Sequence, residues 1–71
     1  MTTQADLDNW FSYHAPHGDQ QVRYEGIRSA GKILAEVILA NTPVVADQSA
    51  AIRHVREAVM TANAAIACGE A

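Results

Sequence analysis

Apolar and small residues recur at helical spacing in the first of two long segments of this chain. Between residues 20 and 41 they repeat every three or four positions, which predicts a helix with one core-facing stripe: Ile27, Ala30, Gly31, Leu34, Val37 and Ile38. Toward its C-terminal end the segment becomes apolar on further sides, at Ile33 and Leu39. A single partner helix cannot bury all of these sides. We therefore expect this helix to pack in more than one direction.

A second long helix is predicted over residues 47–67. It starts at Asp47 or Ser49 and is expected to end at Gly69, after a seam typical of helix–helix packing: Ile52, Val55, Val59, Ala62 and Ile66. The first helix stops before Pro43, because proline lacks an amide donor and disfavours helical geometry in the preceding residue. The chain therefore reverses between the two helices.

Residues 1–18 are predicted to form a short N-terminal arm. Within it, residues 4–11 alternate between an acidic side and an apolar side that contains Trp10 and Phe11. These two rings are expected in the core, because a two-helix core needs large side chains. Asp19 is placed to cap the following helix through its side-chain oxygen.

The predicted fold class is all-α, with one domain over residues 1–71: a short N-terminal helix plus an antiparallel hairpin of helices 19–41 and 47–67. A chain of 71 residues buries little surface on folding. Its single cysteine, Cys68, cannot cross-link the chain to itself. Together with the extra apolar surface, these constraints predict assembly into a homo-oligomer.

Charge narrows the choice of partners. The formal net charge is −3, from five Lys/Arg and eight Asp/Glu. Binding along a DNA or RNA polymer needs many uncompensated basic groups, so neither polymer is an expected partner. The longest apolar stretch, residues 33–40, contains Glu36 and is too short to span a bilayer. We expect a soluble, intracellular protein without a membrane partner, and a local cluster of arginines would still allow it to bind a small anion.

All four aromatic residues lie before residue 25, and this concentration is the strongest chemical signal in the chain. Rings stack on planar ligands and arginines pair with phosphate. Tyr13 is the preferred stacking residue, because it stands in the arm just before the His-x-Pro sequence. Arg28 follows Tyr24 by one helical turn, which favours contact with a phosphate. An ordinary solvated face that Arg28 shares with Lys32 is an equally open interpretation.

The other candidate residues are expected to serve the surface, the core or a pocket wall. Arg53 and Arg56 stand near Glu57 and are expected to serve the surface. Met60 is expected in the core, although with Asn63 it also suits the wall of a pocket. The spacing of His14, His17 and Asp19 does not match a structural zinc site, and no acid–base pair accompanies the rings. We predict no metal, no cofactor and no enzymatic activity.

The chain resembles a known family over most of its length. The resemblance to the phage anti-CBASS cyclic-oligonucleotide sponges, and to the related hairpin domain of anti-Thoeris sponges, rests on Phe11 to Pro16, Gln20, Arg23, Tyr24, Ile27, Arg28 and the alanine-rich ending from Met60 to Ala67. It implies a phage-encoded homo-oligomer, typically a hexamer, in the host-cell cytoplasm. Such proteins trap cyclic dinucleotides such as cGAMP, and cyclic trinucleotides, without cleaving them.

The resemblance also implies roles for individual residues. Tyr13 matches the aromatic that stacks on a purine, and Arg28 matches the basic position near the phosphates, while His14, Pro16 and Arg23 are expected to shape the same pocket. A second, three-fold pocket for cyclic trinucleotides is expected to include Asn63 and Ala67. Two other functions remain open: a structural helical module that oligomerises or docks onto a protein through residues 33–39 and, more remotely, an enzyme acting on cyclic nucleotides.

Overall fold

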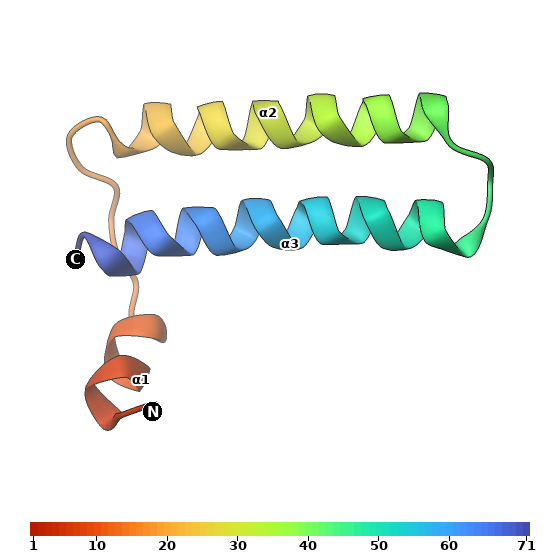
Figure 1. Ribbon diagram of the computed structural model, residues 1–71. Helices are drawn as coiled ribbons and strands as arrows, with labels where there is room; N and C mark the ends of the chain where they lie inside the picture. The colour runs from red at the N-terminus through yellow and green to blue at the C-terminus, as the bar shows by residue number, and fades with distance from the viewer.

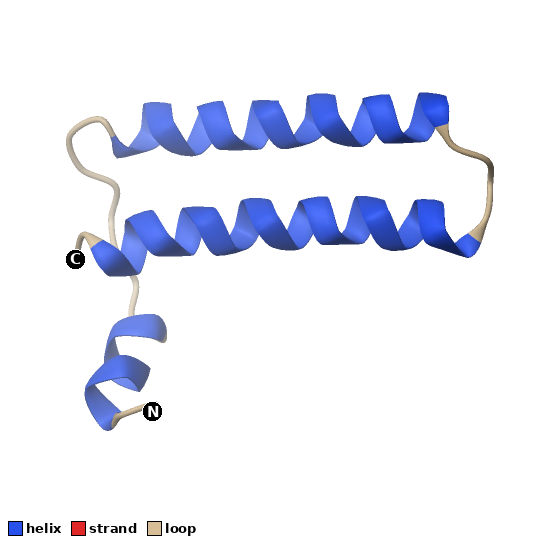
Figure 2. Cartoon of the chain, viewed as in Figure 1, coloured by secondary structure: helices blue, strands red, loops and turns tan.

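The computed structural model describes residues 1–71 and contains helices but no strands. Helix α1 spans Gln4–Trp10, α2 spans Gln20–Asn41 and α3 spans Ala46–Gly69. Helices α2 and α3 lie side by side and antiparallel, while α1 projects from the end of the hairpin where α2 begins and α3 ends (Figures 1 and 2). The predicted short helix and two-helix hairpin are therefore confirmed.

The seam predicted for α3 faces α2. Ile66 is buried, and the remaining seam residues of α3 are half-buried: Ile52, Val55, Val59 and Ala62. On α2 the prediction was only partly right, because the face that this helix turns toward α3 contains smaller residues than expected. Its half-buried face contains Ile27, Gly31, Ala35 and Ile38, whereas Ala30, Leu34 and Val37 are exposed.

Gly31 explains the rotation of α2. A Cβ atom built on Gly31 would overlap the Cγ2 methyl group of Val59, so the two helices approach closely only because this residue has no side chain. Packing around that contact turns Leu34 and Val37 outward, where each keeps 52% of its surface exposed. The hairpin thus carries the exposed second apolar surface that the sequence predicted.

The ends of α2 and α3 differ from expectation in detail. Asp19 occupies the N-cap position of α2 but makes no side-chain cap; its Oδ1 instead accepts a hydrogen bond from Arg23 Nε at 3.1 Å. Helix α3 begins at Ala46, ahead of both predicted starts, and the buried Gln48 holds the turn. Its Nε2 lies 3.1 Å from the carbonyl oxygen of Thr42, to which it donates. Gly69 is the last residue of α3, as expected, and Glu70 takes the C-cap position.

Helix α1 is capped locally but is not packed into the core. Thr3 and Asp6 form a reciprocal capping box, with N···O distances of 2.9 and 3.1 Å. No residue of α1 is buried; Trp10 is 51% exposed and Phe11, just after the helix, is 86% exposed. The expectation that these rings fill the core was therefore wrong for the single chain, because α1 contacts the end of α3 rather than the seam, with Asn9 Nδ2 donating to the carbonyl oxygen of Cys68 at 3.0 Å.

None of the three helices combines the length and apolar character needed to cross a membrane.

The close contact at Gly31 leads to a stability prediction. Gly31→Ala is expected to destabilise the hairpin by about 1–2 kcal/mol, because overpacking against Val59 outweighs the gain in helix propensity. Gly26→Ala is the matched control: no atom lies within 4 Å of its Cβ position, so it should gain up to about 1 kcal/mol. Thermal unfolding followed by circular dichroism measures both. An equal effect of the two substitutions, or an unchanged cost of Gly31→Ala in a Val59→Ala background, would contradict the packing argument.

Candidate functional site

An open groove lies where the arm crosses the end of the hairpin. It encloses about 400 Å³ and is lined by residues from the arm, α2 and α3: Tyr13, His14, Pro16, Tyr24, Arg28, Asn63, Ala64 and Ala67. We call it the aromatic groove. Six of the seven residues singled out from the sequence line it, and Arg23 does not. The residues assigned to two separate pockets therefore border one groove in the single chain.

The arm is anchored on both sides of the segment that lines the groove. On one side, His14 Nε2 donates to the carbonyl oxygen of Asn9 at 2.7 Å. On the other, the His17 amide donates to Gln20 Oε1 at 3.2 Å, and Gly18 adopts a left-handed conformation with φ of +57° that favours glycine. Asn9 in turn donates through Nδ2 to the carbonyl oxygen of Cys68 at 3.0 Å, so the arm is joined to both α3 and α2 while Tyr13 stays 86% exposed.

Arg28 supplies positive charge to the groove. Its side chain is exposed and forms no ion pair, although Glu25 lies three residues earlier on the same helix. Tyr24 is half-buried one turn before it, at the spacing that places two side chains on one helix face. The arrangement offers exposed ring surface and an uncompensated guanidinium in one groove.

Helix α3 lines the groove with small residues and with one polar group that has no hydrogen-bond partner. Ala64 and Ala67 leave room beside the rings, and Asn63 lies between them and the hairpin seam. The side-chain oxygen of Asn63 is buried and accepts no hydrogen bond within the chain. A buried acceptor of this kind costs about 1–3 kcal/mol unless a donor satisfies it. Asn63 therefore lines the groove with a side chain whose oxygen has no donor within the single chain.

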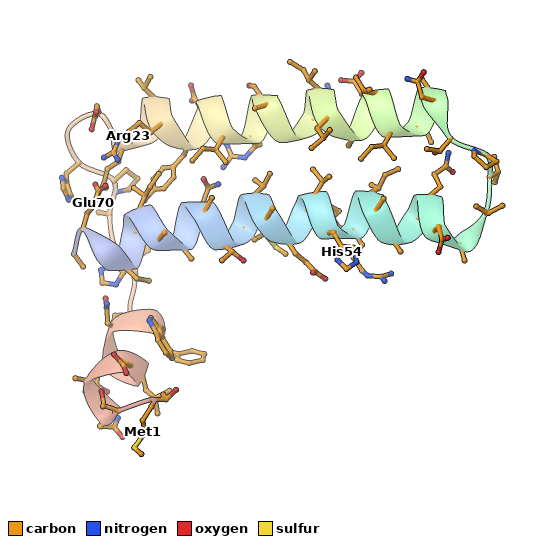
Figure 3. All side chains as sticks on the ribbon, in the orientation of Figure 1. Met1, Arg23, His54 and Glu70 are labelled. Atoms are coloured by element: carbon orange, nitrogen blue, oxygen red, sulfur yellow. The ribbon has the colours of Figure 1, made fainter.

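Arg23 has a different role from the one expected. Its guanidinium reaches Glu70 through two hydrogen bonds, of 2.7 Å from Nη1 to Oε2 and 2.6 Å from Nη2 to Oε1. Gln20, which is almost fully buried, donates to the same Oε1 at 3.0 Å. Figure 3 shows Arg23 and Glu70 pointing toward each other at the open end of the hairpin. This clasp, formed by Gln20, Arg23 and Glu70, joins the start of α2 to the end of α3.

The clasp shifts the titration of both charged partners. Hydrogen bonds from Arg23 and then from Gln20 lower the pKa of the Glu70 carboxyl from 4.5 to about 2. The same pairing raises the pKa of Arg23 above its ordinary value. Both groups are therefore charged at neutral pH, and the charge of Arg23 is directed to Glu70 rather than to the groove.

The remaining predicted roles have mixed outcomes. Arg53 lies on the surface 4.0 Å from Glu57, as expected, but Arg56 forms no ion pair. Met60 is 61% exposed, so the expectation that it belongs to the core was wrong. Nowhere do three His, Cys, Asp or Glu side chains gather closely enough to hold a metal ion. His54 lies far along α3 from the arm, 3.5 Å from Glu57 (Figure 3).

Sequence reasoning omitted two residues of the groove, Tyr24 and Ala64. For Tyr24 a signal was present, because its spacing of four from Arg28 places both on one face of α2. Ala64 had no comparable signal, since α3 contains many alanines and only the packing of the arm selects one of them.

A family model described as Acb2/Tad1, hairpin domain, matches residues 3–67, from the cap of α1 nearly to the end of α3. The chain belongs to this hairpin-domain family. The match confirms the resemblance to the anti-CBASS and anti-Thoeris sponges and supports a sponge-type role against host defence in general. No curated protein and no solved structure matches the chain. The matched residues include every side chain of the aromatic groove but not Glu70.

The clasp leads to a prediction about acid stability. Because the folded-state pKa of Glu70 is depressed, its contribution is complete above pH 4.5 and is lost as the pH falls toward 2. Glu70→Gln should therefore lower the thermal midpoint at pH 6, and the difference from the parent should shrink between pH 4.5 and 2. Glu36→Gln, which removes an exposed carboxylate without an ion pair, should leave the midpoint nearly unchanged at every pH. A Glu70→Gln difference that stays constant down to pH 2 would contradict the assignment.

Proposed function

We propose that this protein is a non-enzymatic sponge that binds and holds cyclic oligonucleotide second messengers, and so inhibits CBASS signalling in the cytoplasm of a phage-infected host cell. Its ligands are cyclic dinucleotides such as cGAMP and cyclic trinucleotides. The proposal rests most directly on one observation: the exposed Tyr13 ring and the unpaired Arg28 border the same groove. Family membership supports the sponge class, and the groove supports the ligand chemistry.

Each part of such a ligand has a complementary group in the aromatic groove. A purine stacked on Tyr13 would gain roughly 1–3 kcal/mol per base. Arg28 would bind a phosphate through charge-assisted hydrogen bonds, which are stronger than neutral ones. Asn63 lines the same groove and would contribute its side-chain amide to recognition of the base. His14, Pro16 and Ala67 would shape the space around the base.

The proposed working form is a homo-oligomer, a hexamer in line with the family resemblance. A single chain leaves Ile33, Leu34, Val37 and Leu39 each more than half exposed on α2, and the rings of Trp10 and Phe11 are exposed as well. Exposed apolar side chains gathered on one helix are typical of an interaction surface. Self-association would bury it and would place grooves of neighbouring copies next to one another.

The same exposed surface also favours a second candidate function, a structural module that oligomerises or docks onto a protein through residues 33–39. The two candidates differ in their response to ligand. A sponge gains thermal stability from added cyclic dinucleotide, because the ligand binds only the folded protein. A purely structural module shows no such gain.

Ligand capture tests the proposed function. Protein in excess over cGAMP should deplete free ligand at once, and heating should return the ligand unchanged, because stacking and hydrogen bonding leave the phosphodiester intact. Tyr13→Ala should weaken capture by roughly 1–3 kcal/mol, the value of the lost stacking. Arg28→Ala should weaken capture as well, because it removes the contact to phosphate. Chromatography of free and released ligand provides the measurement.

Two controls make the capture result specific. Tyr13→Phe keeps the ring and should retain most of the affinity, and Arg53→Ala removes a cation outside the groove and should change little. Folded, oligomeric Tyr13→Ala and Arg28→Ala variants that bind as tightly as the parent would disprove the site. A linear product that accumulates with time would make the protein an enzyme instead.

Assembly is tested on the exposed side of α2. Leu34→Asp or Val37→Asp should dissociate or unfold the protein, because each would force an unpaired charge into the proposed interface. Ser29→Asp adds the same charge at an exposed polar position of the same helix and should leave the assembly intact. Light scattering with circular dichroism distinguishes these outcomes. A parent protein that is a folded monomer at micromolar concentration would contradict the oligomer.

A further inference from the structure

The positive charges of this protein are distributed unevenly over the hairpin. It has only five Lys/Arg residues. Arg23 is held by the clasp and Arg53 lies beside Glu57. The other three, Arg28, Lys32 and Arg56, form no ion pair, and all three line one groove along the hairpin. We call it the cationic groove.

The nearby carboxylates do not neutralise the cationic groove. Glu25 and Glu36 stand three residues before Arg28 and four after Lys32, yet neither forms an ion pair. Glu57, the neighbour of Arg56 in sequence, contacts Arg53 and His54 instead. Three uncompensated cations border one groove on a protein of net charge −3. Such an arrangement raises the local concentration of anions.

The floor of the cationic groove is apolar. Ala35, Val55, Val59 and Met60 contribute most of it, at the seam where Gly31 allows α2 and α3 to approach closely. Such a floor offers van der Waals contact to the apolar parts of a ligand beside the three exposed cations. It also suits the carbon atoms of a sugar. The groove therefore matches a ligand that joins phosphates to a less polar body.

The cationic groove adjoins the aromatic groove at Arg28, which lines both. Along α2, Tyr24, Arg28 and Lys32 follow one another at intervals of four residues, each step about 6 Å along the helix axis. A third groove of the hairpin, which includes Ala30, Leu34, Ala58 and Ala62, contains no Lys or Arg. The cations are therefore confined to the groove that adjoins the tyrosines.

We propose that Lys32 and Arg56, together with Arg28, form a second phosphate subsite that extends the aromatic groove. It would receive one phosphate of an oligonucleotide ligand while a base of the same ligand stacks on Tyr13 and another phosphate lies nearer the rings. This subsite favours ligands with two or more separate phosphates over mononucleotides. The inference rests on the proposed function and names two residues that the aromatic groove does not include.

Charge-neutralising variants test the subsite in the full-length protein. Lys32→Gln and Arg56→Gln should each lower the affinity for cGAMP about tenfold, the loss of roughly one charge-assisted hydrogen bond. Both should also make binding less sensitive to salt. Arg53→Gln removes an equal charge outside the groove and should change the affinity less than about twofold, as expected for an exposed ion pair. Calorimetry at two salt concentrations, with circular dichroism as a folding check, provides these values.

The outcomes separate this inference from the proposed function. If Tyr13→Ala weakens binding but Lys32→Gln and Arg56→Gln do not, the subsite is wrong and the sponge function stands. If no cyclic oligonucleotide binds, inorganic pyrophosphate serves as an independent probe in an NMR titration. Shifts at residues 28–32 and 55–60 that vanish in the Lys32→Gln/Arg56→Gln double variant would support an anion site without the sponge function. Absence of those shifts in the parent would overturn the subsite as well.

Discussion

The close contact between Gly31 of α2 and Val59 of α3 is the constraint on which the rest of this structure depends. A pair of helices has no third layer to cover its sides. The line where the two helices approach most closely therefore forms the floor of the groove on each side of the hairpin. Gly31 and Val59 line both the cationic groove and the apolar groove that includes Leu34. One missing side chain therefore determines the depth of two surfaces that differ in chemistry, one cationic and one apolar.

A two-helix hairpin has little apolar core, and polar contacts at its two ends compensate for this. Ile66 is the one buried apolar residue, whereas the other two buried residues are glutamines. Gln48 holds the turn between the helices through Thr42, and Gln20 contacts both the arm and Glu70 at the open end. Because Gln20 also accepts the His17 amide, the contacts that close the hairpin also hold the segment of the arm that lines the aromatic groove.

Helical periodicity located all three helices, since apolar spacing depends only on local geometry. It failed where partners are distant in sequence: nothing near Arg23 indicates that Glu70, 47 residues later, engages its guanidinium. Six of the seven candidate residues line one groove: four come from the segment that holds the rings, whereas Asn63 and Ala67 lie on the alanine-rich last helix that the family resemblance indicated. Arg56 lies on the surface as expected, but its neighbour Glu57 does not pair with it. Residues adjacent in a helix point apart, and Glu57 faces Arg53 four residues earlier.

The net negative charge of the protein disfavours long nucleic acids, whereas the cationic groove favours small anions. A long nucleic acid crossing this surface would meet eight carboxylates as well as the groove, and its affinity depends on the sum of many phosphate contacts. Under the proposed function, a cyclic oligonucleotide would contact only the three unpaired cations and the tyrosines. The clasp pairs Arg23 with Glu70, and Glu57 lies beside Arg53. The three cations without an ion pair therefore line the groove that adjoins the tyrosines. Under the proposed function, the ion pairs elsewhere on the hairpin would contribute to selectivity by leaving only these cations free.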